Sequence, residues 1–123
     1  MKLLAVMLGG AIGASLRYLS TIGATRMLGK DFPYGTLLVN VSGSLLMGLL
    51  SGLFISKIAV SEEWRLLLLT GILGAFTTFS AFAIETITLF DQGAIARAVL
   101  NVVLNVFLCL AAVWIGLLLA RQI

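Results

Sequence analysis

The sequence predicts an all-α membrane protein in which each chain forms four transmembrane helices within a single domain, residues 1–123. Hydrophobic residues make up 61% of the 123 residues and charged residues only 11%, whereas about a quarter of a soluble domain is charged. Four apolar runs follow one another with short polar breaks, and each can cross a hydrocarbon core of roughly 30 Å. Because backbone groups in lipid must be hydrogen-bonded internally, we expect these runs to be helices. Four crossings use almost all of the 123 residues, so we expect no separate soluble catalytic domain.

The side-chain inventory narrows the class of protein further. The chain has one cysteine, Cys109, and no histidine, so it offers neither an intrachain disulfide nor a zinc site of histidine and cysteine ligands. No nucleophile–base pair or metal cluster is evident, and we expect the protein not to be an enzyme. The eight basic residues are scattered through the apolar chain, which is typical of membrane-edge anchors and not of a nucleic-acid surface.

The first helix is expected over residues 3–22, before a charged loop that contains the only proline. Its segment GGAIGASLRY, residues 9–18, carries small residues that let helices approach closely, and packing is the favoured interpretation of the glycines. Arg17 lies within the span, where an ionisable group is expensive and is a functional candidate. Two interpretations stay open: an anchor at the lipid headgroups, or a cation that faces a water-filled vestibule and attracts anions.

The second helix is expected over residues 34–55. Thr36, Asn40 and Ser44 recur at intervals of four residues, so they form a polar stripe along one face of the helix. The amide of an asparagine can donate two hydrogen bonds. The stripe therefore either joins helices together by hydrogen bonds or lines a pore with donors.

The third helix, expected over residues 64–90, contains the most unusual segment, GILGAFTTFSAF at 71–82. Gly71, Gly74 and the adjacent threonines weaken a helix near the middle of this run, and we predict that the helix is broken there. Non-helical backbone at membrane depth is tolerated only inside protein or beside a cavity. Such a break would free carbonyl groups that can coordinate a cation.

Two phenylalanines follow the predicted break. Phe79 and Phe82 share one face of the helix, and the positive edge of an aromatic ring can face an anion, although core packing is the common role of such a pair. Ser80 and Glu85 add polarity to the same stretch. Glu85 is interpreted as a counter-charge to Arg17 or as a solvated acid at the helix end.

The fourth helix is expected over residues 94–120. Asn101, Asn105 and Cys109 are spaced by four residues, with Arg97 one turn earlier. Two asparagines on one face of a membrane helix are unfavourable against lipid. They are expected to bond neighbouring helices or to supply donors to a polar track.

The basic residues give almost no preferred orientation. With the N-terminus in the cytoplasm, four basic residues lie inside and three outside: Lys2, Lys57, Arg65 and Arg121 against Arg26, Lys30 and Arg97. Lysine and arginine asymmetry normally orients a membrane protein. A difference of one favours a dual-topology protein that pairs with itself in antiparallel fashion, and a fixed topology set by the first helix is the alternative.

Three motifs in order resemble those of the Fluc (CrcB) family of fluoride channels, and the resemblance covers almost the whole chain. GGAIGASLRY at 9–18 is similar to the family's first-helix arginine motif, VNVSG at 39–43 to its second-helix asparagine motif, and GILGAFTTFSAF at 71–82 to its broken third helix. One departure stands out: the family usually has threonine at the position of Ala81, so this chain lacks a hydroxyl there.

The resemblance implies an antiparallel homodimer in the bacterial cytoplasmic (inner) membrane, with two fluoride pores at the subunit interface. It implies that fluoride leaves the cell passively and that a structural sodium ion lies on the dimer axis, held by the backbone carbonyls of Gly74 and Thr77. Asn40 would donate to fluoride. The residues expected along the pores are Phe79, Phe82, Asn40, Ser80, Thr36, Arg17, Glu85, Asn101 and Asn105.

Two rival functions are weaker. A small dual-topology multidrug-type exchanger needs a carboxylate in its first helix, and the first helix here has Arg17 but no acid. A non-transporting membrane subunit would not require arginine, asparagine and a broken helix all within the bilayer.

Overall fold

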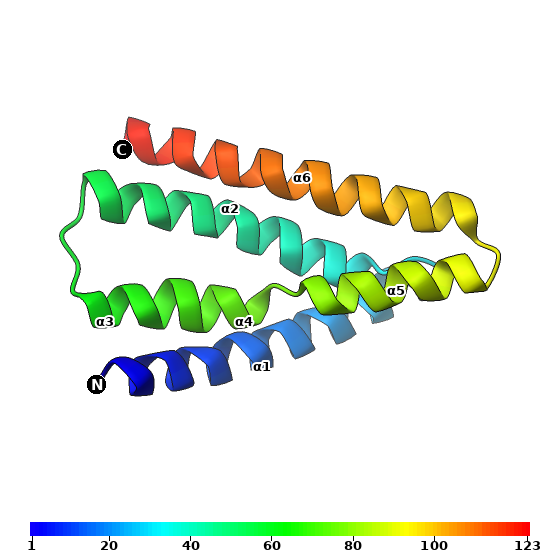
Figure 1. The fold of residues 1–123 in the computed structure, drawn as a ribbon, viewed down its shortest axis with the longest axis horizontal. Helices are drawn as coiled ribbons and strands as arrows, with labels where there is room; N and C mark the ends of the chain where they lie inside the picture. Colours follow the sequence, from blue (N-terminus) through cyan, green and yellow to red (C-terminus); the bar gives the residue numbers. More distant parts are fainter.

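The computed structural model describes residues 1–123 and is helical throughout, without strands (Figure 1). Its elements are α1 (Lys2–Leu28), α2 (Tyr34–Ser56), α3 (Glu62–Arg65), the π-helical η1 (Leu66–Leu73), α4 (Gly74–Phe76), α5 (Phe79–Asp91) and α6 (Ile95–Gln122). Elements α3 to α5 follow one line and together make the third long helical stretch. All four long stretches are apolar enough to cross a bilayer. The prediction of an all-α chain with four membrane-length helices is confirmed.

The first helix is longer than predicted, because it continues past residue 22 to Leu28. Thr25 and Arg26 are polar, but neither residue breaks a helix. The helix ends only where Gly29 adopts a φ of 88°, a left-handed conformation that glycine takes without steric cost. The end of the apolar run therefore marked a change of polarity and not the end of the helix. The other boundaries lie within two residues of the predicted ones.

The four stretches pack mainly as two pairs, α2 against α6 and α1 against η1. Glycines make both contacts close. A Cβ atom at Gly48 would lie 2.2 Å from the carbonyl oxygen of Val113 on α6. On α1, a Cβ at Gly13 would lie 2.1 Å from the carbonyl oxygen of Ile72, and one at Gly9 would meet Leu67. Backbones touch at these points, so the predicted packing role of the first-helix glycines is confirmed for Gly9 and Gly13.

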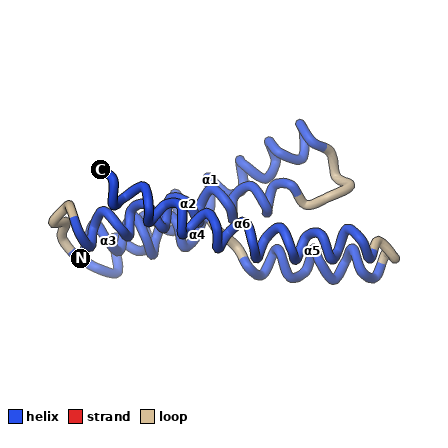
Figure 2. Tube along the Cα trace, turned by 90° about the horizontal axis from the view of Figure 1, so that it is seen from above, coloured by secondary structure: helices blue, strands red, loops and turns tan.

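Both termini and the α2–α3 connection lie at one end of the molecule, whereas the α1–α2 and α5–α6 connections lie at the other (Figure 1). At this second end the two connections stand apart in Figure 2, and Arg97 bridges the gap by donating to the carbonyl oxygen of Asp31 at 3.1 Å. At the first end Lys2 forms an ion pair with Glu62. Charged groups thus mark both ends of the bundle, while the helices between them are mostly apolar.

Large apolar side chains are exposed along the helices. Leu19, Phe107 and Trp114 are each more than 60% exposed, and such side chains are normally withdrawn from water. The surface of the single chain therefore requires lipid or another protein surface around it. The chain is a multi-pass membrane protein.

Candidate functional site

Two residues with extended backbones separate α4 from α5. Thr77 has ψ of 158°, and Thr78 has φ of −154° and ψ of 117°. Asn40 of α2 binds the main chain of Thr78 at two points. Its Oδ1 accepts from the Thr78 N–H at 2.7 Å, and its Nδ2 donates to the Thr78 carbonyl oxygen at 3.0 Å. A buried side chain on one helix thereby satisfies the polar groups of an interruption in another.

At the interruption, two backbone N–H groups donate to side-chain oxygens instead of to the carbonyl oxygens that they would bond in a continuous helix. There, the N–H of Thr78 would donate to Gly74 and the N–H of Ala81 to Thr77. Here the Thr78 N–H donates to Asn40, and the Ala81 N–H donates to the hydroxyl of Thr78 at 3.2 Å, which caps α5. The carbonyl oxygens of Gly74 and Thr77 therefore lose their usual helical partners.

The amide of Asn40 also begins a chain of buried side chains. Its Nδ2 donates to Oδ1 of Asn105 at 3.0 Å, and Nδ2 of Asn105 donates to both Oδ1 and the main-chain oxygen of Asn101, each at 3.0 Å. Nδ2 of Asn101 donates to Oγ1 of Thr86 at 2.9 Å, and Thr86 donates to the carbonyl oxygen of Phe82 at 2.7 Å. The chain therefore runs from the interruption through α2 and α6 to α5.

Sequence reasoning found the three asparagines as candidate site residues, but it missed Thr78 and Thr86. A signal for them exists. Thr78, Phe82 and Thr86 are spaced by four residues. A threonine therefore lies one turn before Phe82 and another one turn after it, on the same face of the helix. Threonine back-bonds to its own helix so often that this spacing alone is weak.

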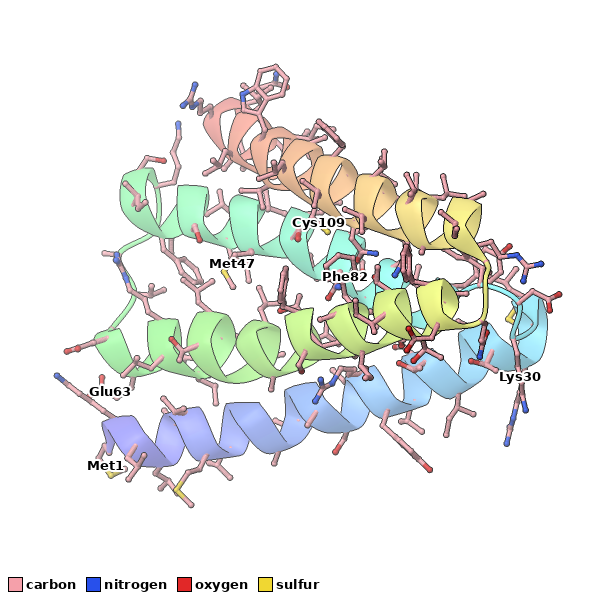
Figure 3. All side chains as sticks on the ribbon, turned by 45° about the vertical axis from the view of Figure 1, so that its right-hand side comes forward. Met1, Lys30, Met47, Glu63, Phe82 and Cys109 are labelled. Carbon is pink, nitrogen blue, oxygen red and sulfur yellow. The ribbon has the colours of Figure 1, made fainter.

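A groove of about 450 Å³ opens beside the interruption. It is lined by Asn40, Gly43, Ser44, Met47, Thr77, Thr78, Phe79, Phe82, Asn105, Val106, Cys109, Leu110 and Val113. Figure 3 shows Met47 of α2, Phe82 of α5 and Cys109 of α6 around this central part of the bundle. The groove combines amide and hydroxyl groups with aromatic and aliphatic walls. Such a mixture is typical of a binding or conduction surface.

Phe79 and Phe82 meet in this groove edge to face, with ring centroids 5.1 Å apart and an interplanar angle of 62°. Phe82 is buried, but Phe79 is 76% exposed. Ser80 is exposed too, and its Oγ lies 3.3 Å from the hydroxyl of Thr78. The structure therefore brings together Asn40, both phenylalanines and Ser80 around one turn of backbone.

Thr36 and Glu85 pair beyond this groove. The Thr36 hydroxyl donates to Oε1 of Glu85 at 2.7 Å, whereas Oε2 is buried without a partner. Glu85 lines a second groove of about 310 Å³ that also contains Lys30. Arg17 makes no ion pair. The interpretation of Glu85 as its counter-charge is therefore wrong within a single chain, because the carboxylate turns toward α2.

These features define a class: a small multi-pass helical membrane protein with a buried amide chain beside an interrupted helix. A family described as CrcB-like protein, Camphor Resistance (CrcB), matches residues 4–117, and the chain belongs to this family. A relative from Methylococcus capsulatus is 52% identical over all of this chain, which spans 54% of that relative's length. Relatives from Vibrio vulnificus and from a Caulobacter species are 48% and 47% identical, over 95% and 99% of this chain and 93% and 96% of their own lengths.

All three relatives are named fluoride-specific ion channel FluC. The resemblance inferred from the three sequence motifs is confirmed by this family membership. The relatives are named channels and not enzymes, which agrees with the expectation that the chain is not an enzyme.

Proposed function

We propose that the chain is a fluoride-selective ion channel that lets cytoplasmic fluoride leave the cell passively. The groove beside the interruption carries the proposal, because amide donors and an edge-to-face aromatic pair line it together. Amide hydrogens can replace part of the hydration shell of an anion, and ring edges attract the anion without a full charge. The names of the relatives support the same ion.

Asn40 is the proposed fluoride donor. Both hydrogens of its Nδ2 are already engaged, one by the Thr78 carbonyl oxygen and one by Asn105. A passing fluoride would compete with the neutral carbonyl for the first hydrogen, and a charged acceptor makes the stronger bond. Release of fluoride restores the original bond, so the site recovers after each ion. The other proposed path residues are Thr36, Arg17, Ser80, Glu85, Asn101 and Asn105.

The functional unit is proposed to be an antiparallel homodimer in the bacterial cytoplasmic membrane. Phe79 is highly exposed in the single chain although it lines the groove, so a second copy would close the open side and complete a pore. Two such pores follow from the two-fold symmetry. The near-equal number of basic residues at the two ends supports insertion in both orientations.

A sodium ion is proposed to hold the two interrupted helices together, bound by the carbonyl oxygens of Gly74 and Thr77 from both copies. The residues fit such an ion, because side chains of this chain take up the N–H groups that would otherwise bond these carbonyls. Carbonyl oxygens without net charge suit a monovalent cation better than a divalent one. The ion would supply positive charge between the two pores.

The test is fluoride efflux from liposomes that carry the purified protein, with chloride as the control anion. We expect rapid fluoride efflux, little chloride efflux, and loss of flux when sodium is replaced throughout by N-methylglucamine. Equal passage of both anions would contradict selectivity. Exchange of an organic cation for protons would support a multidrug-type exchanger, and absence of any flux would support a non-transporting subunit.

The dual topology of the proposed dimer has its own test. Labelling of an added cysteine at the C-terminus, in a Cys109→Ala background, should find termini on both sides of the membrane. Labelling on one side alone would contradict dual topology. Two lysines added next to Lys57 should shift the population toward one orientation.

A further inference from the structure

The protein contains only three asparagines, and hydrogen bonds join the side chains of all three in one series. Asn40 and Asn105 line the groove, whereas Asn101 does not. Asn101 is fully buried, and its side-chain amide donates to the hydroxyl of Thr86 on α5. Thr86 itself lies outside the groove. It can therefore affect a permeating ion only through the amides that connect it to the groove.

Backbone groups fix the direction of the bonds that Asn40, Asn105 and Thr86 make in this series. The Thr78 N–H can only donate, so the oxygen of Asn40 must face it and the nitrogen must face Asn105. The main-chain oxygen of Asn101 can only accept, so the nitrogen of Asn105 must face Asn101. At the far end the carbonyl oxygen of Phe82 can only accept, so the Thr86 hydroxyl donates to it and accepts from Asn101. No amide in the chain can rotate by half a turn without losing bonds.

We propose that Thr86 is a positioning residue for the fluoride path, which fixes the orientation of the Asn101 amide and, through Asn101 and Asn105, polarises the amide of Asn40. The inference rests on the proposed function. Thr86 has this role because its hydroxyl both accepts and donates, and it supplies the final acceptor for three aligned amides. Bonds in such a series polarise one another, so the last acceptor strengthens the first donor.

Loss of the Thr86 hydroxyl has a defined consequence. The Nδ2 hydrogens of the fully buried Asn101 would have no acceptor on α5, and an unsatisfied buried donor is costly. Rotation of the Asn101 amide would then place its nitrogen against the nitrogen of Asn105. Asn105 would keep its bond to the main-chain oxygen of Asn101, and Asn40 would keep its bonds to Thr78. However, the bond from Asn105 to the Asn101 side chain would be lost or weakened, and with it the polarisation that reaches the amide of Asn40.

The neighbouring Thr88 provides a matched control. It lies on the same helix and donates to the carbonyl oxygen of Ile84 at 2.8 Å, in the same way that Thr86 donates to Phe82. However, Thr88 is exposed and accepts no bond from an asparagine. Thr86→Val and Thr88→Val therefore each remove a threonine hydroxyl and its bond to a carbonyl oxygen of the same helix. Only Thr86→Val also removes an acceptor from the series of asparagine amides.

The experiment combines fluoride efflux from liposomes with NMR spectra of protein labelled with side-chain ¹⁵N only at asparagine. Three asparagines give three amide signals, all from this chain. In Thr86→Val we expect efflux to fall about three- to tenfold, the change in rate that loss of one net hydrogen bond produces. The signals of Asn40 and Asn105 should shift along with that of Asn101. Thr86→Ser and Thr88→Val should retain the wild-type efflux and the wild-type signals of Asn40.

Wild-type efflux in Thr86→Val, or shifts confined to Asn101, would overturn the inference. If Thr86→Val does not fold, Thr86→Ala gives the same comparison without a branched side chain. The wild-type protein supplies an independent check. The side-chain amide hydrogens of Asn101 should exchange with deuterium far more slowly than those of free asparagine. Fast exchange would show that the hydrogen-bonded series of asparagines does not form. Absence of fluoride efflux from the wild type would instead overturn the proposed function, while the spectra would still decide whether Thr86 influences the amide of Asn40.

Discussion

Two contacts between helices, which we call the glycine seam and the amide seam, use the same four-residue spacing but are sensitive to opposite changes: one to an added atom and the other to a lost hydrogen bond. The glycine seam consists of Gly9 and Gly13 of α1 against Gly71 and its neighbours in η1, where backbones touch directly. The amide seam consists of the hydrogen-bonded asparagines of α2 and α6. The first seam has no room for an added atom. The second needs every hydrogen bond, because its polar groups are buried. Spacing alone therefore reveals that two helices meet, and the chemistry of the spaced residue reveals what the contact cannot lose.

Asn40→Leu should cause the largest effect, because it removes one end of the amide seam while keeping a similar volume. The main-chain N–H and carbonyl of Thr78 and the side-chain oxygen of Asn105 would lose their partners. Each unsatisfied buried group costs about 1–3 kcal/mol. We expect fluoride efflux at least about a hundredfold lower, the rate equivalent of roughly 2.7 kcal/mol.

The matched control is Ser42→Ala, two residues along the same helix. Ser42 bonds only to the carbonyl oxygen of Leu38 in its own helix, so its loss should leave efflux within about twofold of wild type. If Asn40→Leu conducts fluoride at the wild-type rate, the amide seam has no part in permeation.

Gly74→Val should have the next largest effect, and it separates the single chain from the proposed dimer. Within this chain a Cβ at Gly74 would meet only the carbonyl oxygen of Leu69, at 3.5 Å, which is an ordinary contact. The substitution should therefore leave helix content unchanged. Beside a sodium ion on the dimer axis, the valine would crowd the bound ion and the second copy, and efflux should fall at least about tenfold.

Thr77→Ser is the control for the sodium site, because it keeps the main-chain carbonyl. Its expected cost is limited to the methyl group that packs against Gly43, about 1 kcal/mol of stability. Wild-type efflux and sodium dependence in Gly74→Val would contradict the proposed ion site.

Gly13→Ala tests the glycine seam, and its effect should fall on stability more than on conduction. The added Cβ would lie 2.1 Å from the carbonyl oxygen of Ile72, so backbone must shift, at a cost of about 1–3 kcal/mol. Gly10→Ala is the internal comparison, since nothing lies within 4 Å of a Cβ there. Thermal unfolding in detergent should show a lower midpoint for Gly13→Ala alone. An equal midpoint for both variants would contradict the close packing of α1 on η1.

Much of this contrast could be predicted from the sequence. The apolar runs gave the four long helices, and the spacing of Asn101 and Asn105 indicated a shared buried face. The end of α1 could not be predicted, because Thr25 and Arg26 are polar yet compatible with a helix. The π-helical backbone of η1 has no distinct sequence signal, since its leucines fit an α-helix equally well.

Partners were harder to predict than positions. Glu85 was expected to face Arg17 or solvent, but it accepts a hydrogen bond from Thr36. Opposite charge made Arg17 the natural candidate, whereas the choice of partner depends on which helices are neighbours in space. Asn40 was expected to bond either a neighbouring helix or a permeating ion, and its bonds within this chain reach α6 and the interruption.

Ala81→Thr should have the smallest effect, although it introduces the residue that the family resemblance leads us to expect there. Ala81 contributes its main-chain N–H to the cap of α5, where the hydroxyl of Thr78 accepts it at 3.2 Å. A threonine keeps that N–H, so the cap and the interruption should be preserved. The new hydroxyl can bond within its own helix, which adds little to stability. We expect efflux within about twofold of wild type and no change in the asparagine amide signals, because no bond of the amide seam involves the Ala81 side chain. A change of tenfold or more in the ratio of fluoride efflux to chloride efflux would show instead that a hydroxyl at position 81 belongs to the conduction path. The polar groups of that path would then include α5 as well as the amide seam.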